Sequence, residues 1–239
     1  MAVRTDYPRH AKAPARPSRG VAAVLAVVGE VMLTVGILVL LYVVYVLWGT
    51  GIQTERAQDQ LRAEISADWP DPVRAESTAP PAEVPEEVID EIDLGDGYAL
   101  LRIPRFGDDW AWVVVEGVQL SDLSRGPGHY QDTANPGELG NLAIAGHRAG
   151  HGAPFADLDE IEVGDVIEVE TATGIWTYTV DQGPQIIAPT NLWVVDPVPG
   201  EDADAEPADR RITLTTCHPR YGSSQRLYVS GVLSAGEEV

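Results

Sequence analysis

Short runs of β-forming residues at near-even spacing dominate the C-terminal part of the chain. Gly, Pro, Asn and Asp separate these runs, and the helix-like stretches there are short, around 120–125 and 154–160. Many short strands of this kind predict a mainly β domain that closes, or nearly closes, into an antiparallel barrel. The predicted strands cover residues 98–103, 110–118, 141–146, 165–170, 175–180, 185–188, 211–216 and 226–233.

A long apolar run near the N-terminus predicts a membrane anchor. Residues 21–48 are apolar apart from Glu30 and Thr34. As a helix rising about 1.5 Å per residue, the run exceeds the roughly 30 Å hydrocarbon core of a bilayer. It is also too long for the apolar region of a cleaved signal peptide, so we expect an uncleaved transmembrane anchor. The basic residues of the segment 1–20 then place this tail in the cytoplasm and everything after Trp48 outside.

Charge and composition divide the chain and exclude one class of partner. Residues 49–97 are acidic and Pro-rich, which predicts an extracytoplasmic stalk with a possible helix over 54–65. The formal net charge of −21 disfavours nucleic-acid binding, because negative charge repels phosphate. We therefore expect a basic cytoplasmic tail at 1–20, an anchor at 21–48, a stalk at 49–97 and one β domain at 98–239.

The single cysteine of the chain, Cys217, ends a predicted strand. Arg226 begins the next predicted strand after a loop that contains Pro, Gly and Ser, and facing residues of such antiparallel strands lie within side-chain reach. A cysteine nucleophile needs a base for its thiol and a cation or donor for the oxyanion that it creates. Arg226 suits the second task, and His147, which follows the apolar run 141–146, is the best candidate for the first.

Four motifs in this order resemble those of the sortases, the membrane-anchored cysteine transpeptidases of Gram-positive cell surfaces. They are Gly-Pro-Gly-His-Tyr at 126–130, Pro-Gly-Glu-Leu-Gly-Asn at 136–141, Ala-Gly-His-Arg at 145–148 and Thr-Leu-Thr-Thr-Cys-His-Pro from Thr213. The similarity spans roughly residues 98–239, and the last motif is most similar to class E. The resemblance implies a closed eight-stranded β-barrel that needs no cofactor, with Cys217, His147 and Arg226 as the catalytic residues.

The resemblance also implies a reaction and its partners. A class E-like sortase cleaves a C-terminal sorting signal of the LAXTG or LPXTG kind between Thr and Gly. It holds the new carboxyl end as a thioester on Cys217 and passes it to a cell-wall amine of lipid II or peptidoglycan. The expected partners are surface proteins with such a signal, the cell-wall precursor and the membrane, without nucleic acid or metal. Thr215 and Thr216 are expected to line the substrate groove, and Tyr221 to shape its wall.

A different interpretation is a non-catalytic or metal-binding β-barrel module of the cell envelope. His147, His151, Cys217 and His218 are residue types that bind zinc, but the glycines around His151 disfavour the helix that would present two histidines to one face. A lone cysteine can also be a small buried hydrophobe. His129 and His151 remain rivals to His147 as the base, whereas His218 and Cys217, as consecutive strand residues, point to opposite faces.

Overall fold

The structure, a computed structural model, describes residues 19–68, 93–201 and 205–238 of the chain. The described part divides into two units, one that ends at Val44 and one that begins at Tyr45. Most of the basic tail expected at 1–20 lies outside the described residues, and so does the Pro-rich part of the expected stalk at 69–92.

The first unit is helix α1 (Arg19–Val44), which is rich in Val, Leu, Ala and Gly. Within it, Ala22–Val44 has a mean hydropathy of 2.6, and no part of this segment is buried in the described structure. Length and composition alone make α1 a candidate membrane span, as the sequence predicts. The second unit begins with a π-helical turn, η1 (Tyr45–Gly49).

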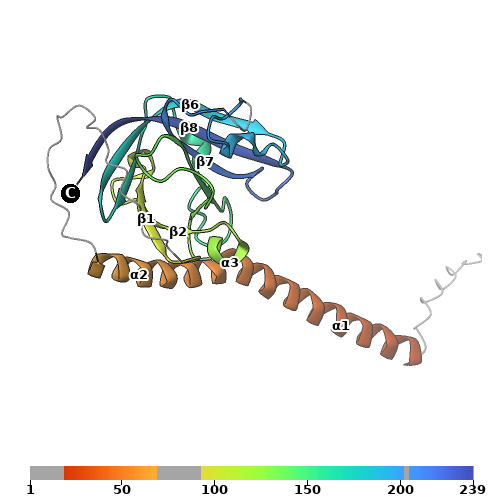
Figure 1. Ribbon diagram of the computed structural model, residues 1–239. Coiled ribbons are helices and arrows are strands. Elements are labelled where there is room, and N and C mark those ends of the chain that lie inside the picture. The colour runs from red at the N-terminus through yellow and green to blue at the C-terminus, as the bar shows by residue number, and fades with distance from the viewer. Residues whose placement is uncertain (1–18, 69–92, 202–204, 239) are drawn as a thin grey trace, which may run out of the picture. The chain divides into compact units, whose positions relative to one another are not determined.

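The second unit is built around a closed β-barrel, which confirms the predicted fold class (Figure 1). Among the described residues, eight strands follow one another around the barrel in the order β1-β2-β3-β4-β7-β8-β6-β5, and β5 pairs with β1. The strands are β1 (Gly97–Arg102), β2 (Ala111–Glu116), β3 (Gly128–His129), β4 (Gly140–Gly146), β5 (Val166–Thr171), β6 (Gly174–Ile187), β7 (Arg210–His218) and β8 (Gln225–Glu238). Short helices between them are η2 (Pro104–Phe106), α3 (Leu120–Leu123), η3 (Leu158–Glu160) and η4 (Leu192–Val195).

The strand pairing differs from the purely antiparallel barrel that the sequence favours. The pairs β2–β3 and β4–β7 are parallel, so that expectation is wrong. Parallel neighbours need a crossover, and the chain passes through β5 and β6 on its way from β4 to β7. β6 also joins the two predicted strands 175–180 and 185–188 through an irregular register, and the two-residue strand β3 is absent from the predicted set.

Aliphatic and aromatic side chains from around the sheet fill the barrel. Along β5, buried residues alternate with partly buried ones, because only one face of the strand points inward. Every residue of β4 is buried. Its outer face is covered by the segment around η4, where Asn141 donates hydrogen bonds to the carbonyl oxygens of Val194 and Asp196. The core includes Leu101, Ile144, Ile167, Tyr178 and Leu214.

Helix α2 (Thr50–Asp68) packs against β1 and β2 (Figure 1). Leu61 and Ile65 are buried against apolar side chains of β2. Gln58 pairs with the backbone of Val113 as a neighbouring strand would, because its Nε2 donates to the Val113 carbonyl at 2.9 Å and its Oε1 accepts from the Val113 N–H at 2.8 Å. Residues 50–68, part of the expected stalk, therefore form a helix that is docked on the barrel.

Candidate active site

Cys217 and Arg226 are direct partners in the antiparallel ladder of β7 and β8. Such partners point to the same face of a sheet, with Cβ atoms about 4.5–5.5 Å apart. The Cys217 thiol is free and partly buried. Arg226 donates from Nη1 to the carbonyl oxygens of Ser223 and Gln225, both at 3.2 Å. Cys217 and Arg226, which the sequence singles out, are therefore cross-strand neighbours at one end of β7.

His147 reaches the same place through the parallel pairing of β4 with β7. The last pair of that ladder is Gly146 with Thr216, and Thr216 Oγ1 donates to the Gly146 carbonyl at 2.7 Å. His147 and Cys217 each follow this last pair by one residue, so the register carries both to the same end of the ladder. The three residues thus meet at one rim of the barrel, which we call the catalytic rim, where β4 and β7 end and β8 begins.

The surroundings of His147 favour its neutral form. Burial lowers its pKa from the ordinary value of 6.5, and the neighbouring His151 lowers that pKa further. The two rings are stacked, with centroids 4.8 Å apart and an angle of 23° between their planes. An imidazole with a lowered pKa is neutral at pH 7 and can accept the proton of a thiol. His147 therefore has the ionisation behaviour that a general base requires.

Tyr130 is a further side chain at the catalytic rim, and the sequence alone does not single it out. Burial has the largest effect on its phenol and raises the pKa, the Arg226 cation lowers the pKa, and Cys217 raises it. The phenol therefore lies within electrostatic reach of both residues. The sequence signal that could have identified Tyr130 is its place at the end of the motif Gly-Pro-Gly-His-Tyr. Tyr130 directly follows β3, which pairs with β4.

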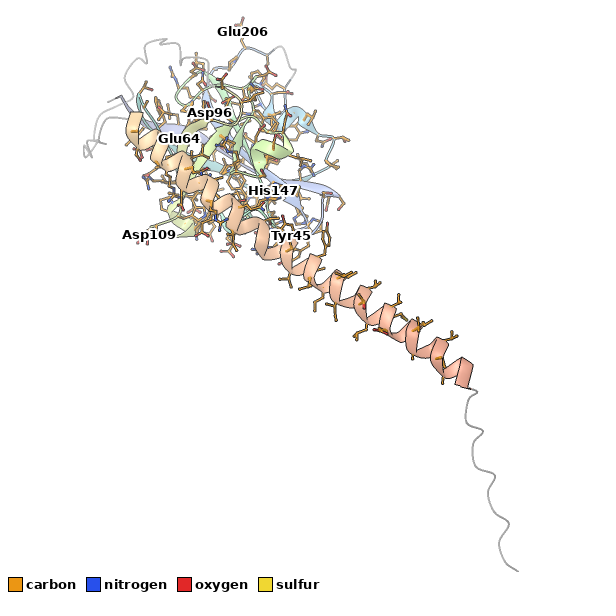
Figure 2. All side chains as sticks on the ribbon, turned by 90° about the horizontal axis from the view of Figure 1, so that it is seen from below. Tyr45, Glu64, Asp96, Asp109, His147 and Glu206 are labelled. Atoms are coloured by element: carbon orange, nitrogen blue, oxygen red, sulfur yellow. The ribbon has the colours of Figure 1, made fainter. Side chains whose placement is uncertain are left out.

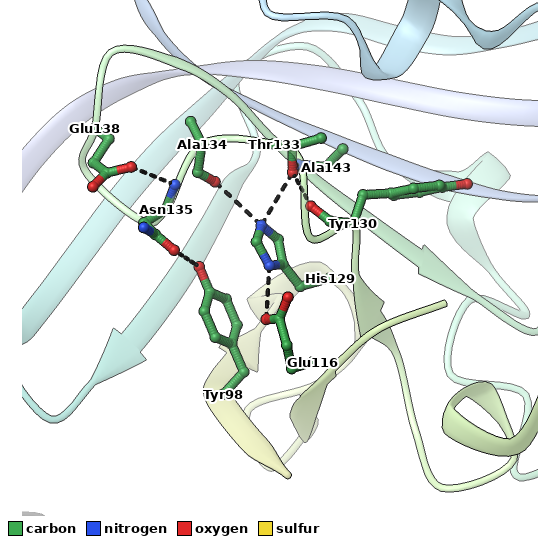
Figure 3. Close-up of polar contacts among 9 residues, drawn as sticks. All are labelled: Tyr98, Glu116, His129, Tyr130, Thr133, Ala134, Asn135, Glu138 and Ala143. Atoms are coloured by element: carbon green, nitrogen blue, oxygen red, sulfur yellow. Dashed lines mark hydrogen bonds and ion pairs between the residues drawn. The ribbon is translucent and has the colours of Figure 1, made fainter. Parts of the chain in front are cut away.

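His129, one of the rival bases, is held in a buried network instead (Figure 3). Its side chain is 2% exposed, with Nδ1 at 2.9 Å from Glu116 Oε2 and Nε2 at 3.0 Å from Thr133 Oγ1. The ring of Tyr98 stacks on the imidazole with centroids 4.4 Å apart. Because protein groups engage both ring nitrogens, His129 fixes the loop around Thr133, and its nitrogens are already occupied by these partners.

The three residues expected to contact substrate lie in different environments. Thr216 is buried and uses its hydroxyl to join the ends of β4 and β7. Thr215 is also buried and pairs with Tyr228 in the ladder of β7 and β8. Tyr221 lies in the turn between these strands and is 81% exposed. Of the three, only Tyr221 presents most of its side chain to solvent.

Arg148, in the loop after β4, joins the end of β7 to η3. Its side chain is 4% exposed, and it donates to His218 Nδ1 at 2.7 Å and to the Asp159 carboxylate at 2.6 Å. His218 Nδ1 is therefore a hydrogen-bond acceptor, and its ring is held by Arg148. Over the described ranges of the chain, no group of three or more His, Cys, Asp or Glu side chains is placed to hold a metal ion.

The family model of the sortase domain matches residues 101–234. The chain belongs to the sortase family. Sortase SrtE1 of Streptomyces coelicolor is 35% identical to this sortase over 230 residues, which cover 92% of this chain and 61% of the relative. Sortase SrtE2 of the same organism is 32% identical over 231 residues, which cover 94% of this chain and 87% of the relative. This sortase thus spans less than two thirds of the length of SrtE1.

A solved relative has the same fold. The structure of sortase E1 from Streptomyces coelicolor with a tripeptide in the active site is 37% identical to this sortase, with a TM-score of 0.55. The match covers 60% of this chain and 91% of that one. These comparisons confirm three predictions from the sequence: a sortase of class E character, a closed eight-stranded barrel, and a cysteine transpeptidase as the class of enzyme.

Proposed function

We propose that Cys217, His147 and Arg226 carry out transpeptidation as nucleophile, acid–base and oxyanion donor. The observation that supports this proposal is the register of three adjacent strands. Cys217 pairs with Arg226 in the ladder of β7 and β8. The β4–β7 ladder ends at the pair Gly146 with Thr216, so His147 and Cys217, the next residues, follow at the same end. Convergence of these three residue types from distant parts of the chain is the arrangement that thioester chemistry needs.

In the first half of the reaction, the Cys217 thiolate attacks the carbonyl carbon of a peptide bond in the substrate. Negative charge develops on the carbonyl oxygen, and the guanidinium of Arg226 donates hydrogen bonds to it. The C–N bond then breaks. The leaving amine takes a proton from the His147 imidazolium, and the acyl group remains on sulfur as a thioester.

In the second half, an acceptor amine attacks the thioester carbonyl. Neutral His147 removes a proton from the attacking nitrogen, and Arg226 again stabilises the oxyanion. Collapse of the intermediate forms a new peptide bond and releases the Cys217 thiolate. The lowered pKa of His147 helps this step, because the ring returns readily to the neutral form that accepts a proton.

The proposed substrate is a surface protein with a C-terminal sorting signal of the LAXTG or LPXTG kind, cleaved between Thr and Gly. Support comes from the class E relatives, one of which holds a tripeptide in its active site. Tyr130 lies within electrostatic reach of Cys217 and Arg226, and we propose that it forms part of the peptide groove with Thr215, Thr216 and Tyr221. The proposed acceptor is an amine of the cell-wall precursor, lipid II or peptidoglycan.

We further propose that α1 anchors the enzyme in the membrane with its N-terminus in the cytoplasm and the barrel on the outer side. The support is the apolar segment Ala22–Val44 together with the basic residues that precede it in the sequence. Protease added to intact cells should remove the barrel and leave the N-terminal tail protected. Protection of the barrel would contradict this orientation.

The test uses the full chain in detergent micelles with LAXTG and LPXTG peptides and triglycine as the amine. Mass spectrometry should show cleavage between Thr and Gly, a ligated product when triglycine is present, and an acyl adduct on Cys217 when it is absent. Cys217→Ala should lose all three signals. Turnover by Cys217→Ala, or cleavage at a different bond, would overturn the proposal.

A further inference from the structure

The segment that follows His147 has an unusual backbone. Four consecutive residues have positive φ angles: Gly150 at 69°, His151 at 47°, Gly152 at 71° and Ala153 at 47°. Residues other than glycine seldom adopt this left-handed region, and such conformations persist only where the surroundings enforce them. Something other than local preference must therefore hold His151 and Ala153 in place.

Helix α2 provides a contact that holds this segment. The backbone N–H of His151 donates to Thr50 Oγ1 at 3.1 Å, and the same hydroxyl donates to the Val46 carbonyl at 2.8 Å. Thr50 is buried at this contact. On the other side of the segment, a Cβ at Gly152 would lie 2.5 Å from the ring of Trp112 on β2, so that only glycine fits there. The segment is thus held between Thr50 of α2 and Trp112 of the barrel.

The helix itself is firmly fixed, so Thr50 is not a mobile partner. One turn further along, Thr54 is fully buried and donates to the Ser124 carbonyl at 2.7 Å. Gln58 bonds to both backbone groups of Val113 and to the Arg125 carbonyl at 2.9 Å. Figure 2 shows α2 running along the barrel, with Glu64 towards its C-terminal end and with Tyr45 and His147 near the opposite end.

The His151 ring carries this contact to His147. The two imidazoles stack with centroids 4.8 Å apart. A stacked ring restricts rotation of its neighbour and leaves the edge of that neighbour, where the nitrogens are, open to other partners. The chain of contacts therefore runs from the docked helix through Thr50 and the backbone of His151 to the ring of His147.

We propose that Thr50 and His151 are positioning residues, through which helix α2 sets the orientation of the His147 ring at the catalytic rim. This inference rests on the proposed role of His147 as acid–base. It makes α2 part of the catalytic unit, since the barrel strands alone contain no group that takes the place of the Thr50 hydroxyl at His151 among the described hydrogen bonds. Neither residue takes part in bond making.

The first test compares two buried threonines on the same helix, each changed to its isostere valine in the full chain in detergent. Thr50→Val removes the acceptor for His151, whereas Thr54→Val removes a docking bond to Ser124 and leaves the His151 contact intact. We expect Thr50→Val to lower kcat about tenfold, less than the roughly 10²-fold cost of a 1 Å misplacement, with KM within about twofold. Thr54→Val should lower the melting temperature and keep kcat, and Thr50→Ser should restore the wild-type rate.

Amide hydrogen exchange supplies a readout that does not depend on turnover. Residues 150–153 should lose protection in Thr50→Val and keep it in Thr54→Val. Equal kcat and equal exchange in the two valine variants would overturn the inference. If Thr50→Val does not fold, the His151 variant below still decides the matter.

The second test is His151→Asn, because asparagine tolerates the left-handed backbone better than most residues but removes the stacked ring. Loss of the ring exposes His147 and removes the neighbour that helps to lower its pKa. The acid limb of the kcat/KM profile should therefore move to higher pH, with a lower kcat. An unchanged profile would contradict the inference. Turnover by His147→Asn is a separate result that would instead overturn the proposed role of His147.

Discussion

Arg148 gives the sharpest test of how the catalytic rim is held together. Its guanidinium is nearly inaccessible and bonds to His218 Nδ1 at 2.7 Å, to Asp159 at 2.6 Å and to the Ala156 carbonyl at 3.3 Å. Arg148→Met keeps an unbranched apolar stem and removes all three contacts. We expect this change to destabilise the fold by about 3 kcal/mol.

The magnitude follows from the environment of each partner. The bond from the charged guanidinium to His218 contributes roughly 1.5–3 kcal/mol, and the long bond to Ala156 roughly 0.5–1 kcal/mol. Asp159 is 51% exposed and regains water when Arg148 is removed, so this ion pair adds at most about 1 kcal/mol. At roughly 2–4 °C for each kcal/mol in a domain of this size, the melting temperature should fall by about 6–12 °C.

The assay is thermal unfolding of the full chain in detergent. Near-UV circular dichroism of the aromatic residues in the barrel monitors the transition and gives the melting temperature. Arg220→Met is the matched control, because Arg220 joins the neighbouring segments that follow β7 and β4 through Asp157 at 3.3 Å. Both of these side chains are about half exposed, at 45% and 50%, and their loss should cost less than about 0.5 kcal/mol. Equal melting temperatures for the two variants would refute the reasoning.

Three further predictions concern chemistry and packing. Arg226→Lys keeps the charge but loses the planar fork, and kcat should fall by about 10²-fold or more; near-normal turnover would make Arg226 a structural residue. Because burial lowers the pKa of His147 below 6.5, the acid limb of kcat/KM should have its midpoint below pH 6.5, and a midpoint above that value would contradict the assignment. Leu61→Ala should destabilise the fold by roughly 2–5 kcal/mol and expose the amides of α2 to exchange, because Leu61 is fully buried between α2 and β2. Ile52→Ala, at a position of α2 that is 52% exposed, is its control and should leave both quantities nearly unchanged.

All strands of the barrel except β3 could be predicted because each of them carries a local pattern, but their pairing could not. The runs that end before His147 and at Cys217 are visible in the sequence as β-formers followed by turn residues. That β4 and β7 are parallel neighbours depends on the path of the chain through β5 and β6, which no local pattern records. The resemblance to sortases supplied the meeting of His147 with Cys217, and the register of the strands gives its physical reason.

The sequence contains a pattern that corresponds to the docked face of α2, but the polar residues in it make the pattern hard to recognise. Thr54, Gln58, Leu61 and Ile65 recur at intervals of four, three and four residues, which places them on one face of a helix. Two of the four are polar, so the face does not stand out as an apolar stripe. Its polar members are satisfied by backbone groups of the barrel, at Ser124 and at Val113 and Arg125, and only the folded structure shows those partners.

At the catalytic rim, the neighbours of Cys217 are held by short hydrogen bonds, whereas the Arg226 guanidinium makes only long ones. This difference favours catalysis. The residues on both sides of Cys217 are held through their side chains, because the Thr216 hydroxyl donates to the Gly146 carbonyl and the His218 ring accepts from Arg148. Within the described part of the chain, the Arg226 guanidinium, in contrast, donates only to two carbonyl oxygens of its own turn, each at 3.2 Å, which is long for a charged donor. On the proposed mechanism the guanidinium exchanges these weak contacts for a shorter bond to the oxyanion, so the interaction strengthens as the transition state forms. A donor that gains most at that moment lowers the barrier rather than merely binding the substrate.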